Sequence, residues 1–278
     1  MSFRTILVYC DAGPGTPARL KIAADLAARH AGHVIGLFVR QAFQAPAFTD
    51  AGPPMDSLYR SYETALKADE AMAMAAFRDV IGQSGEGGAG DWWATDGLVE
   101  EVMMAEARYA DLVILGQDGP DAPVTTAPSG LAEDVVLTGL RPVMIVPHIG
   151  VMKPPGSNVM LCWNESREAV RAATAALPLL ERADKVTILL IDPRTRDGRE
   201  PGADVAAWLG RHGVKATVQR DSMADSDVGA VILSRAADLD ADLIVMGLYG
   251  HSRMREWVLG GASRTLLASM TVPVFVMH

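Results

Sequence analysis

The sequence contains little cysteine, no long apolar run and no excess of basic residues. Its only cysteines are Cys10 and Cys162. Two cysteines exclude a disulfide framework or a four-cysteine metal site, and each follows an apolar run typical of the core. No apolar run reaches the roughly 18 residues that a membrane-spanning helix needs, and the first residues lack the pattern of a signal peptide. We therefore expect a cytoplasmic protein with no membrane partner.

The charge balance and the spacing of the histidines argue against two further classes of protein, those that bind nucleic acid and those that bind a metal. The chain has 34 acidic and 25 basic residues, a formal net charge of −9. Because nucleic acids are bound through an excess of Lys and Arg, we expect no nucleic-acid partner. The six histidines have no spacing typical of metal ligands, so we expect no metal site. With 278 residues, 49% of them hydrophobic, the chain is globular and long enough for two domains.

An internal duplication divides the chain. ADLVILGQDG (110–119) and ADLIVMGLYG (241–250) match with their aspartates 131 residues apart, and RPVMIVP and VPVFVMH repeat at the same spacing. The runs TILVYCD and NVMLCWN also correspond, but at a spacing of 153. This pattern indicates two related halves. The first carries about 22 extra residues, which we place at 41–60, a segment interpreted as a loop or lid that leads into a helix.

The boundary falls in HIGVMKPPGSN, where Pro154, Pro155 and Gly156 interrupt the pattern. We predict domains at 1–150 and 156–278. Short apolar runs alternate with segments of helical period, which is typical of α/β domains with a five-stranded parallel sheet and helices on both faces. The helices expected in the second half cover 166–182, 203–211, 227–239 and 261–268, and Pro178 should kink the first or end it early.

The segment MGLYGHSRMREWVLGGASRTLL (246–267) combines glycines with a basic stretch. Gly247 and Gly250 follow a predicted strand, while Gly260 and Gly261 precede a predicted helix. Free backbone N–H groups and a helix N-terminus favour an anion such as phosphate, and glycine lets the backbone approach it closely. Ser263 adds a hydroxyl. The candidate donors around it are His251, Ser252 and Arg253, and Ala262 lies in the same Gly-Gly-Ala-Ser helix start. The alternative is that these glycines merely close turns.

This segment has the spacing G-x2-G-x9-G and resembles the nucleotide loop of the universal stress protein family, in which a hydroxyl residue follows the last glycine. The two halves resemble the tandem form of that family. The resemblance implies a binding site for ATP, alone or with Mg²⁺, and domains that pair through their last strands. It assigns Gly247, Gly250, Gly260 and Ser263 to phosphate and ribose contacts, and Met246 and Ile191 to the adenine pocket. Asn164 stands where ATP-binding members have an aspartate, and Gly261 replaces the first hydroxyl of the motif.

The first half departs from this pattern. Its corresponding segment, GQDGPDAPVTTAPSGLAED (116–134), has Leu131 in place of Gly261 and Glu133 in place of Ser263. We expect Leu131 to crowd the backbone and the nearby carboxylates to repel a triphosphate. The acids concerned are Asp118, Asp121, Glu133 and Asp134. Asp11 keeps the acidic residue after the first strand, but we expect a degenerate site with a structural or regulatory role.

Three functions compete. The first is an ATP-binding stress-response or signalling protein with its site in the second half and an unknown protein partner. The second is an interaction or scaffold protein of the same fold that binds no nucleotide. The third is an enzyme of adenylate chemistry, which we do not expect because no general base, nucleophile or carboxylate pair is recognisable. The last strands could pair within the chain, as a pseudo-dimer, or between the chains of a homodimer.

Overall fold

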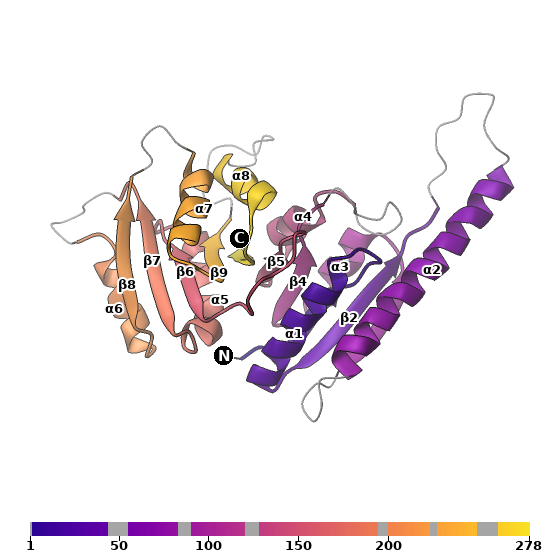
Figure 1. Ribbon diagram of the computed structural model, residues 1–278, viewed down its shortest axis with the longest axis horizontal. Coiled ribbons are helices and arrows are strands. Elements are labelled where there is room, and N and C mark those ends of the chain that lie inside the picture. The colour runs from indigo at the N-terminus through magenta and orange to yellow at the C-terminus, as the bar shows by residue number, and fades with distance from the viewer. Residues whose placement is uncertain are drawn as a thin grey trace.

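The computed structural model describes residues 2–43, 55–82, 90–119, 128–193, 200–222, 227–248 and 261–278. Its described strands form one sheet in the order β3-β2-β1-β4-β5-β10-β9-β6-β7-β8, with helices packed along both faces (Figure 1). The first half supplies β1 to β5 and the second half β6 to β10. Within each half every pairing is parallel, which confirms the predicted fold class.

The two halves repeat the same element order. The elements of the first half are β1 (Thr5–Tyr9), α1 (Thr16–His30), β2 (His33–Arg40), α2 (Met55–Gly82), β3 (Gly90–Asp96), α3 (Val99–Ala107), β4 (Leu112–Gly116), α4 (Leu131–Thr138) and β5 (Val143–Val146). Those of the second half are β6 (Asn158–Cys162), α5 (Arg167–Leu180), β7 (Lys185–Ile191), α6 (Ala203–Arg211), β8 (Ala216–Asp221), α7 (Val228–Asp238), β9 (Leu243–Gly247), α8 (Gly261–Ser269) and β10 (Val274–Met277).

Each face of the sheet has its own apolar layer that runs through both halves. One layer packs beneath α1, α2, α5 and α6, and the other beneath α3, α4, α7 and α8. Side chains alternate between the layers along each strand, so Ile6 and Val8 belong to the first layer while Leu7 and Tyr9 belong to the second. Strands buried on both faces need apolar residues at every position, which explains the continuous apolar runs of the sequence.

The halves join through their last strands. β10 pairs antiparallel with β5, and Phe275 lies opposite Met144. Both residues are fully buried, so the junction is part of the core. Of the two predicted alternatives, this is the pairing within one chain, an intramolecular pseudo-dimer.

The aspartates of the duplicated ADL motif explain why it repeats. Asp111 accepts hydrogen bonds from the N–H groups of Arg4 and Thr5, at 2.8 and 3.0 Å. Asp242 accepts three, from Gly156 (2.7 Å), Ser157 (3.1 Å) and Asn158 (2.8 Å). In each half the carboxylate thus fixes the entry of the first strand beside the fourth. Gly156 has φ +108, a conformation that requires glycine.

The extra length of the first half lies partly elsewhere than predicted. α2 has 28 residues, whereas α6 at the equivalent place has nine. Residues 55–60, predicted as loop or lid, already form the first turns of α2, where Asp56 in the first turn is favoured by the helix dipole. Residues 44–54 of the predicted loop lie outside the described residues. α2 projects beyond the sheet at the end where it begins (Figure 1).

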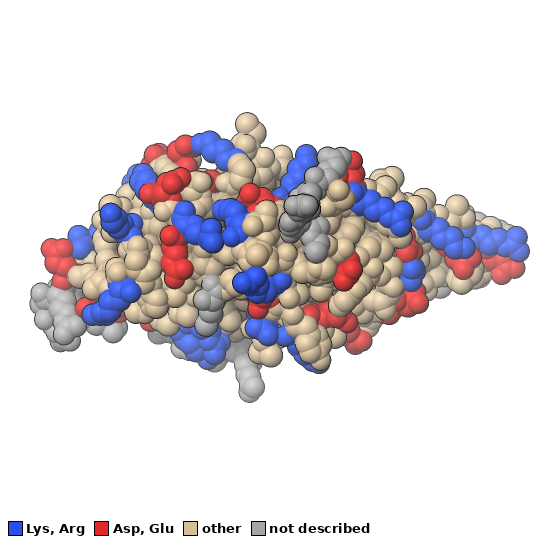
Figure 2. All heavy atoms as spheres, turned by 90° about the horizontal axis from the view of Figure 1, so that it is seen from below, with Lys and Arg blue, Asp and Glu red and all other residues tan. Residues whose placement is uncertain are grey.

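The helix limits of the second half agree with the prediction to within about two residues. α5 continues past Pro178 and ends at Leu180, two residues short of the predicted end. Ser166 caps its start, since the Ser166 hydroxyl accepts the Ala169 N–H at 3.1 Å. None of the described helices is long and apolar enough to cross a membrane. On the face shown in Figure 2, basic and acidic side chains are interspersed.

Candidate functional site

The predicted site of the second half lies where the strand order reverses. The chain builds β6, β7 and β8 in one direction and then returns to place β9 on the other side of β6. In open parallel sheets such a reversal leaves a crevice beyond the carboxyl ends of the strands, where ligands bind. Asn164 follows β6, Ile191 ends β7 and Gly247 ends β9. The fold therefore brings together three residues that lie far apart in the sequence.

The residues of this edge differ in exposure. Asn164 is exposed, Ile191 is half-buried and Met246 is buried. The Asn164 side-chain oxygen accepts the Ser166 N–H at 3.1 Å. In the first half Asp11 makes the same turn, accepting the Gly13 N–H at 2.8 Å. An asparagine at this place thus preserves the local turn while removing a negative charge.

Gly247 has a packing reason to be glycine. A Cβ at this position would lie 2.4 Å from both the Ala169 nitrogen and the Glu168 carbonyl carbon, so the first turn of α5 packs directly on the end of β9. The Glu168 carboxylate is buried and ion-paired with Arg167 at 2.8 Å. Burial acts to raise the pKa of Glu168, but hydrogen bonds from its own backbone and from Arg167 outweigh it and lower the pKa. Glu168 was not among the predicted site residues.

The phosphate-binding part of the prediction is described only at one end. Gly250, His251, Ser252, Arg253 and Gly260 lie outside the described residues. α8 begins at Gly261, as predicted. Gly261 and Ala262 lie in its first turn. Ser263 is buried, with 6% of its surface exposed. The assignment of these residues to a nucleotide stays a prediction.

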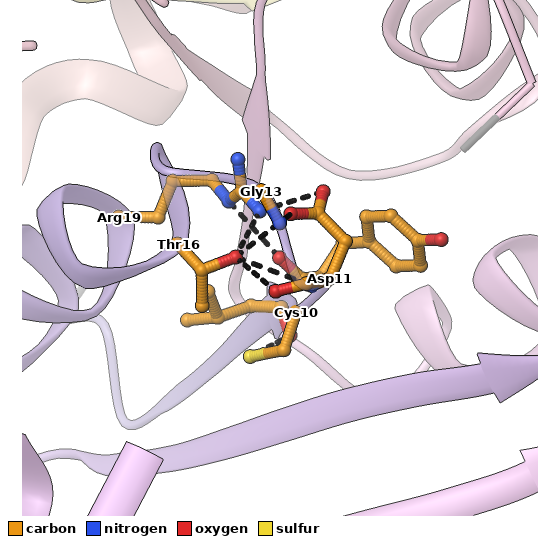
Figure 3. A network of polar contacts seen from close by, with 7 residues as sticks. Cys10, Asp11, Gly13, Thr16 and Arg19 are labelled. Carbon is orange, nitrogen blue, oxygen red and sulfur yellow. Dashed lines mark hydrogen bonds and ion pairs between the residues drawn. The ribbon is translucent and has the colours of Figure 1, made fainter. Parts of the chain in front are cut away.

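In the first half the equivalent crevice is occupied by a side chain of α1. The Arg19 guanidinium pairs with Asp11 at 2.8 Å and donates to the Tyr9 carbonyl at 3.0 Å and to the Thr16 hydroxyl at 2.7 Å (Figure 3). It also covers Gly116, because a Cβ on that glycine would lie 2.4 Å from the guanidinium. Arg19 and Asp11 are both buried. The ion pair therefore closes the point where the strand order reverses between β1 and β4.

A second internal contact satisfies the start of α4. The Asp118 carboxylate accepts the Gly130 N–H at 2.7 Å and the Ser129 hydroxyl at 3.0 Å. A carboxylate at a helix N-terminus is favoured by the same dipole that attracts phosphate. Leu131, which we expected to crowd the loop, is instead buried in the core. That the first half binds no nucleotide stays a prediction. Asp121 lies outside the described residues.

The two halves also meet around a small cavity of about 260 Å³ between α4 and α8. Glu133 and Arg264 line it from opposite halves. Burial, reinforced by Asp118 and Asp134, raises the pKa of Glu133, and Arg264 partly offsets this. Gln117 bridges the halves by donating to the Leu267 carbonyl at 2.7 Å, while its oxygen accepts the His148 N–H at 3.1 Å.

Cys10 directly follows β1 and Cys162 ends β6, and the two are not paired with each other. Cys10 is fully buried, as expected for a core position, and Cys162 is partly buried. Burial raises the pKa of each thiol to about 12, so neither is a thiolate at neutral pH. Among the described residues, no group of three His, Cys, Asp or Glu side chains is placed to hold a metal ion.

These features define a tandem α/β protein whose two doubly wound halves share one sheet, each with a reversal of strand order beside its first strand. Residues 157–278 match the model of the universal stress protein family, so the second half is a universal stress protein domain. This confirms the resemblance seen in the sequence, and the full length has the tandem form of that fold. No curated protein matches the sequence.

Solved structures share the fold over the whole chain. A universal stress protein from Archaeoglobus fulgidus DSM 4304 has a TM-score of 0.67 at 18% identity, covering 99% of this chain and 97% of that one. A functionally unknown protein from Pseudomonas aeruginosa PAO1 has a TM-score of 0.61 at 14% identity, covering 99% and 92%. At these identities the likeness shows the fold, including its two-domain arrangement.

The buried ion pair between Arg19 and Asp11 was not predicted, although the sequence contains a signal for it. At the spacing of 153 that aligns Asp11 with Asn164, Arg19 aligns with Ala172 and Thr16 with Ala169. Ala172 is fully buried in α5. A basic side chain at a buried helix position of one half, where the other half has alanine, indicates a buried partner. Asp11 is that partner, and comparison along α1 and α5 would have identified the pair.

Proposed function

We propose that the second half binds an adenine nucleotide, with ATP as the expected ligand, and that the first half does not. The observation that carries this proposal is the reversal of strand order between β6 and β9, flanked by Asn164 and Gly247, in a universal stress protein domain. At the equivalent of Arg19 this half has Ala172, so no guanidinium from that position enters the crevice. The first half, by contrast, fills its crevice with an internal ion pair.

The chemistry of the described residues fits such a ligand. Ile191 and Met246 offer apolar surface for a base, and the Asn164 side chain can exchange hydrogen bonds with a ribose or base. α8 begins at Gly261 and presents backbone N–H groups that favour a phosphate. Mg²⁺ would enter with the ATP, because it takes phosphate and water oxygens as ligands.

We further propose a binding and signalling role in stress response without catalysis. The nucleotide state of the second half would be read by a protein partner. Purified protein incubated with ATP and Mg²⁺ should produce ADP no faster than a heat-denatured sample. Turnover that depends on folded protein would contradict this part of the proposal.

The decisive experiment is calorimetric titration of ATP into the full chain. We expect one ATP per chain. Ser263→Glu introduces the residue found at the equivalent position of the first half, and repulsion between two charges should weaken binding more than about tenfold. The matched control is Glu133→Ser, which should leave the stoichiometry at one. Circular dichroism and thermal unfolding check that each variant is folded.

Three outcomes would overturn the proposal. They are no binding by the wild-type chain, two sites per chain, or unchanged affinity in folded Ser263→Glu. If Ser263→Glu does not fold, Ser263→Ala replaces it, with an expected weakening of about fivefold for one lost hydrogen bond. Absence of binding by the wild-type chain would favour the second candidate, an interaction protein of the same fold.

A further inference from the structure

A separate cavity of about 1030 Å³ lies in the first half, beyond the carboxyl ends of β2 and β3. Its walls come from three places: the end of β2 with the residues that follow it, the first half of α2, and the turn from β3 into α3. This volume is at the upper end of the range typical of small-molecule sites. It lies two strands away from β4, so it is distinct from the crevice that Arg19 closes.

Three aromatic rings line this cavity. The Phe43 ring contacts Tyr59 edge to face at a centroid distance of 5.9 Å and Tyr62 in a tilted arrangement at 5.4 Å. The Tyr62 hydroxyl donates to the Gln41 carbonyl at 2.9 Å, which holds α2 against the segment after β2. Aromatic faces carry partial negative charge and attract cations.

Arg40 holds the walls together and is therefore engaged in internal contacts. Its guanidinium donates two hydrogen bonds to Glu70 on α2, both 2.6 Å, and lies 3.8 Å from Asp96 at the end of β3. Its carbonyl accepts the Gly97 N–H at 3.1 Å. Gly97 has φ +154, so this turn into α3 favours glycine. The cavity is thus held in shape by paired groups.

The remaining charge of the cavity is negative. Besides the paired Arg40, Glu70 and Asp96, the lining contains Glu63, Glu101 and Lys67. Taken together, the carboxylates outnumber the basic groups by two. Because Glu70 already accepts two hydrogen bonds from the Arg40 guanidinium, Arg40 is poorly placed to recognise an anionic ligand. An anion entering here would face net repulsion, and a neutral molecule would gain only from the apolar rings.

We propose that this cavity binds an organic ammonium cation. The rings of Phe43, Tyr59 and Tyr62 contact its apolar body and cationic head, while Glu63 and Glu101 supply the counter-charge. This site does not depend on nucleotide binding in the second half. ATP titrated in the presence of the saturating cation should bind with unchanged affinity, so the two proposals succeed or fail separately.

In the first experiment the full chain is titrated with three ligands of similar size and different charge, and binding is measured by calorimetry and NMR. These are benzyltrimethylammonium, neutral benzyl alcohol and anionic phenylacetate. We expect the cation to bind at least about tenfold more tightly than either comparator, from cation–π attraction and the negative lining. Equal affinities, preference for another ligand, or no binding of the cation would overturn the proposal.

Variants locate the binding. Tyr62→Ala should weaken the cation about tenfold through loss of a ring, whereas Tyr62→Phe should bind within about twofold of the wild type. Glu63→Gln should weaken it about threefold and reduce the salt dependence. The matched control is Glu181→Gln at the exposed end of α5, which should change nothing. If Tyr62→Ala does not fold, Glu63→Gln decides, and wild-type affinity in that variant would overturn the assignment.

Discussion

The two halves share a scaffold and differ at the point where the strand order reverses. In the first half, Arg19 and Asp11 form a buried ion pair in the crevice, and Asp118 satisfies the start of α4. In the second half the equivalents of Arg19 and Asp11 are Ala172 and Asn164. Meanwhile Asp111 and Asp242 hold the same strand entries in both halves. A duplicated domain can therefore close its crevice with a few internal side chains and keep its scaffold unchanged.

The ion pair gives the largest expected effect. Arg19→Ala leaves Asp11 buried and without its partner, which should lower the free energy of unfolding by about 3–5 kcal/mol. Adding Asp11→Asn, so that both positions match the second half, should recover part of that loss. Urea unfolding measures both. Arg220→Ala, which removes an exposed ion pair with Glu200, is the control and should cost less than about 1 kcal/mol. A cost of that size for Arg19→Ala would show that the ion pair between Arg19 and Asp11 contributes little to the free energy of unfolding.

Acid should destabilise the first half through His30. This side chain is buried against Phe3, with ring centroids 5.2 Å apart, and its Nε2 has no hydrogen-bond partner among the described residues. Burial, reinforced by Arg182, lowers the pKa of His30 from 6.5 to about 4. The unfolded chain therefore binds the proton first, and stability present above pH 6.5 is lost as the pH falls toward 4. The loss should approach about 3 kcal/mol.

The variant His30→Leu tests this assignment. Its free energy of unfolding, measured from pH 7 to pH 4, should fall less steeply than that of the wild type. The corresponding residue of the second half is Ala183, which cannot titrate. His212→Leu, at the exposed end of α6, should retain the wild-type slope. Parallel curves for the wild type and His30→Leu would refute the prediction.

The strand-entry aspartates should differ in strength between the halves. Asp242→Ala leaves three N–H groups without their acceptor and should cost about 3 kcal/mol, whereas Asp111→Ala leaves two and should cost about 2 kcal/mol. Hydrogen exchange locates the effects, with faster exchange expected at the start of β6 in the first variant and of β1 in the second. Equal costs would mean that the carboxylates, and not the number of bonds, set the energy.

The smallest effect belongs to Asp118. Asp118→Ala removes the acceptor of the Gly130 N–H, which should destabilise α4 locally by about 1 kcal/mol, visible as faster exchange in that helix. Calorimetry should still find one ATP per chain, because Arg19 continues to close the crevice. A second bound ATP in this variant would instead identify Asp118 as the block and contradict the role given to Arg19.

Much of the fold follows from the sequence because it depends on local patterns. The spacing of 131 identifies β4 and β9 as equivalent strands of the two halves, and likewise β5 and β10. Continuous apolar runs indicate that these strands are buried on both faces. The helix after the loop was predicted, but α2 begins at Met55 and not after residue 60, because the proline-rich stretch that indicates a loop ends at Pro54.

The site was less predictable because it depends on contacts between distant segments. Asp118 and Gly130 meet only once the chain between β4 and α4 is folded, and a charge pattern alone reads Asp118 as a repulsive acid and not as a helix cap. Gly247 was assigned to phosphate, yet its contact with α5 already requires glycine. The Arg19 pair was accessible in principle, through alignment of α1 with α5.

The pairing of β5 with β10 also limits self-association. Two separate five-stranded sheets would expose four edge strands, each with unpaired backbone groups able to recruit another chain. In the joined sheet only β3 and β8, among the described strands, keep an open edge. Both edges carry charged side chains, with Asp91 and Asp96 on β3 and Arg220 and Asp221 on β8. Fusion of the halves thus pairs two edge strands with each other, and the remaining two edge strands carry charges that oppose the addition of a further strand.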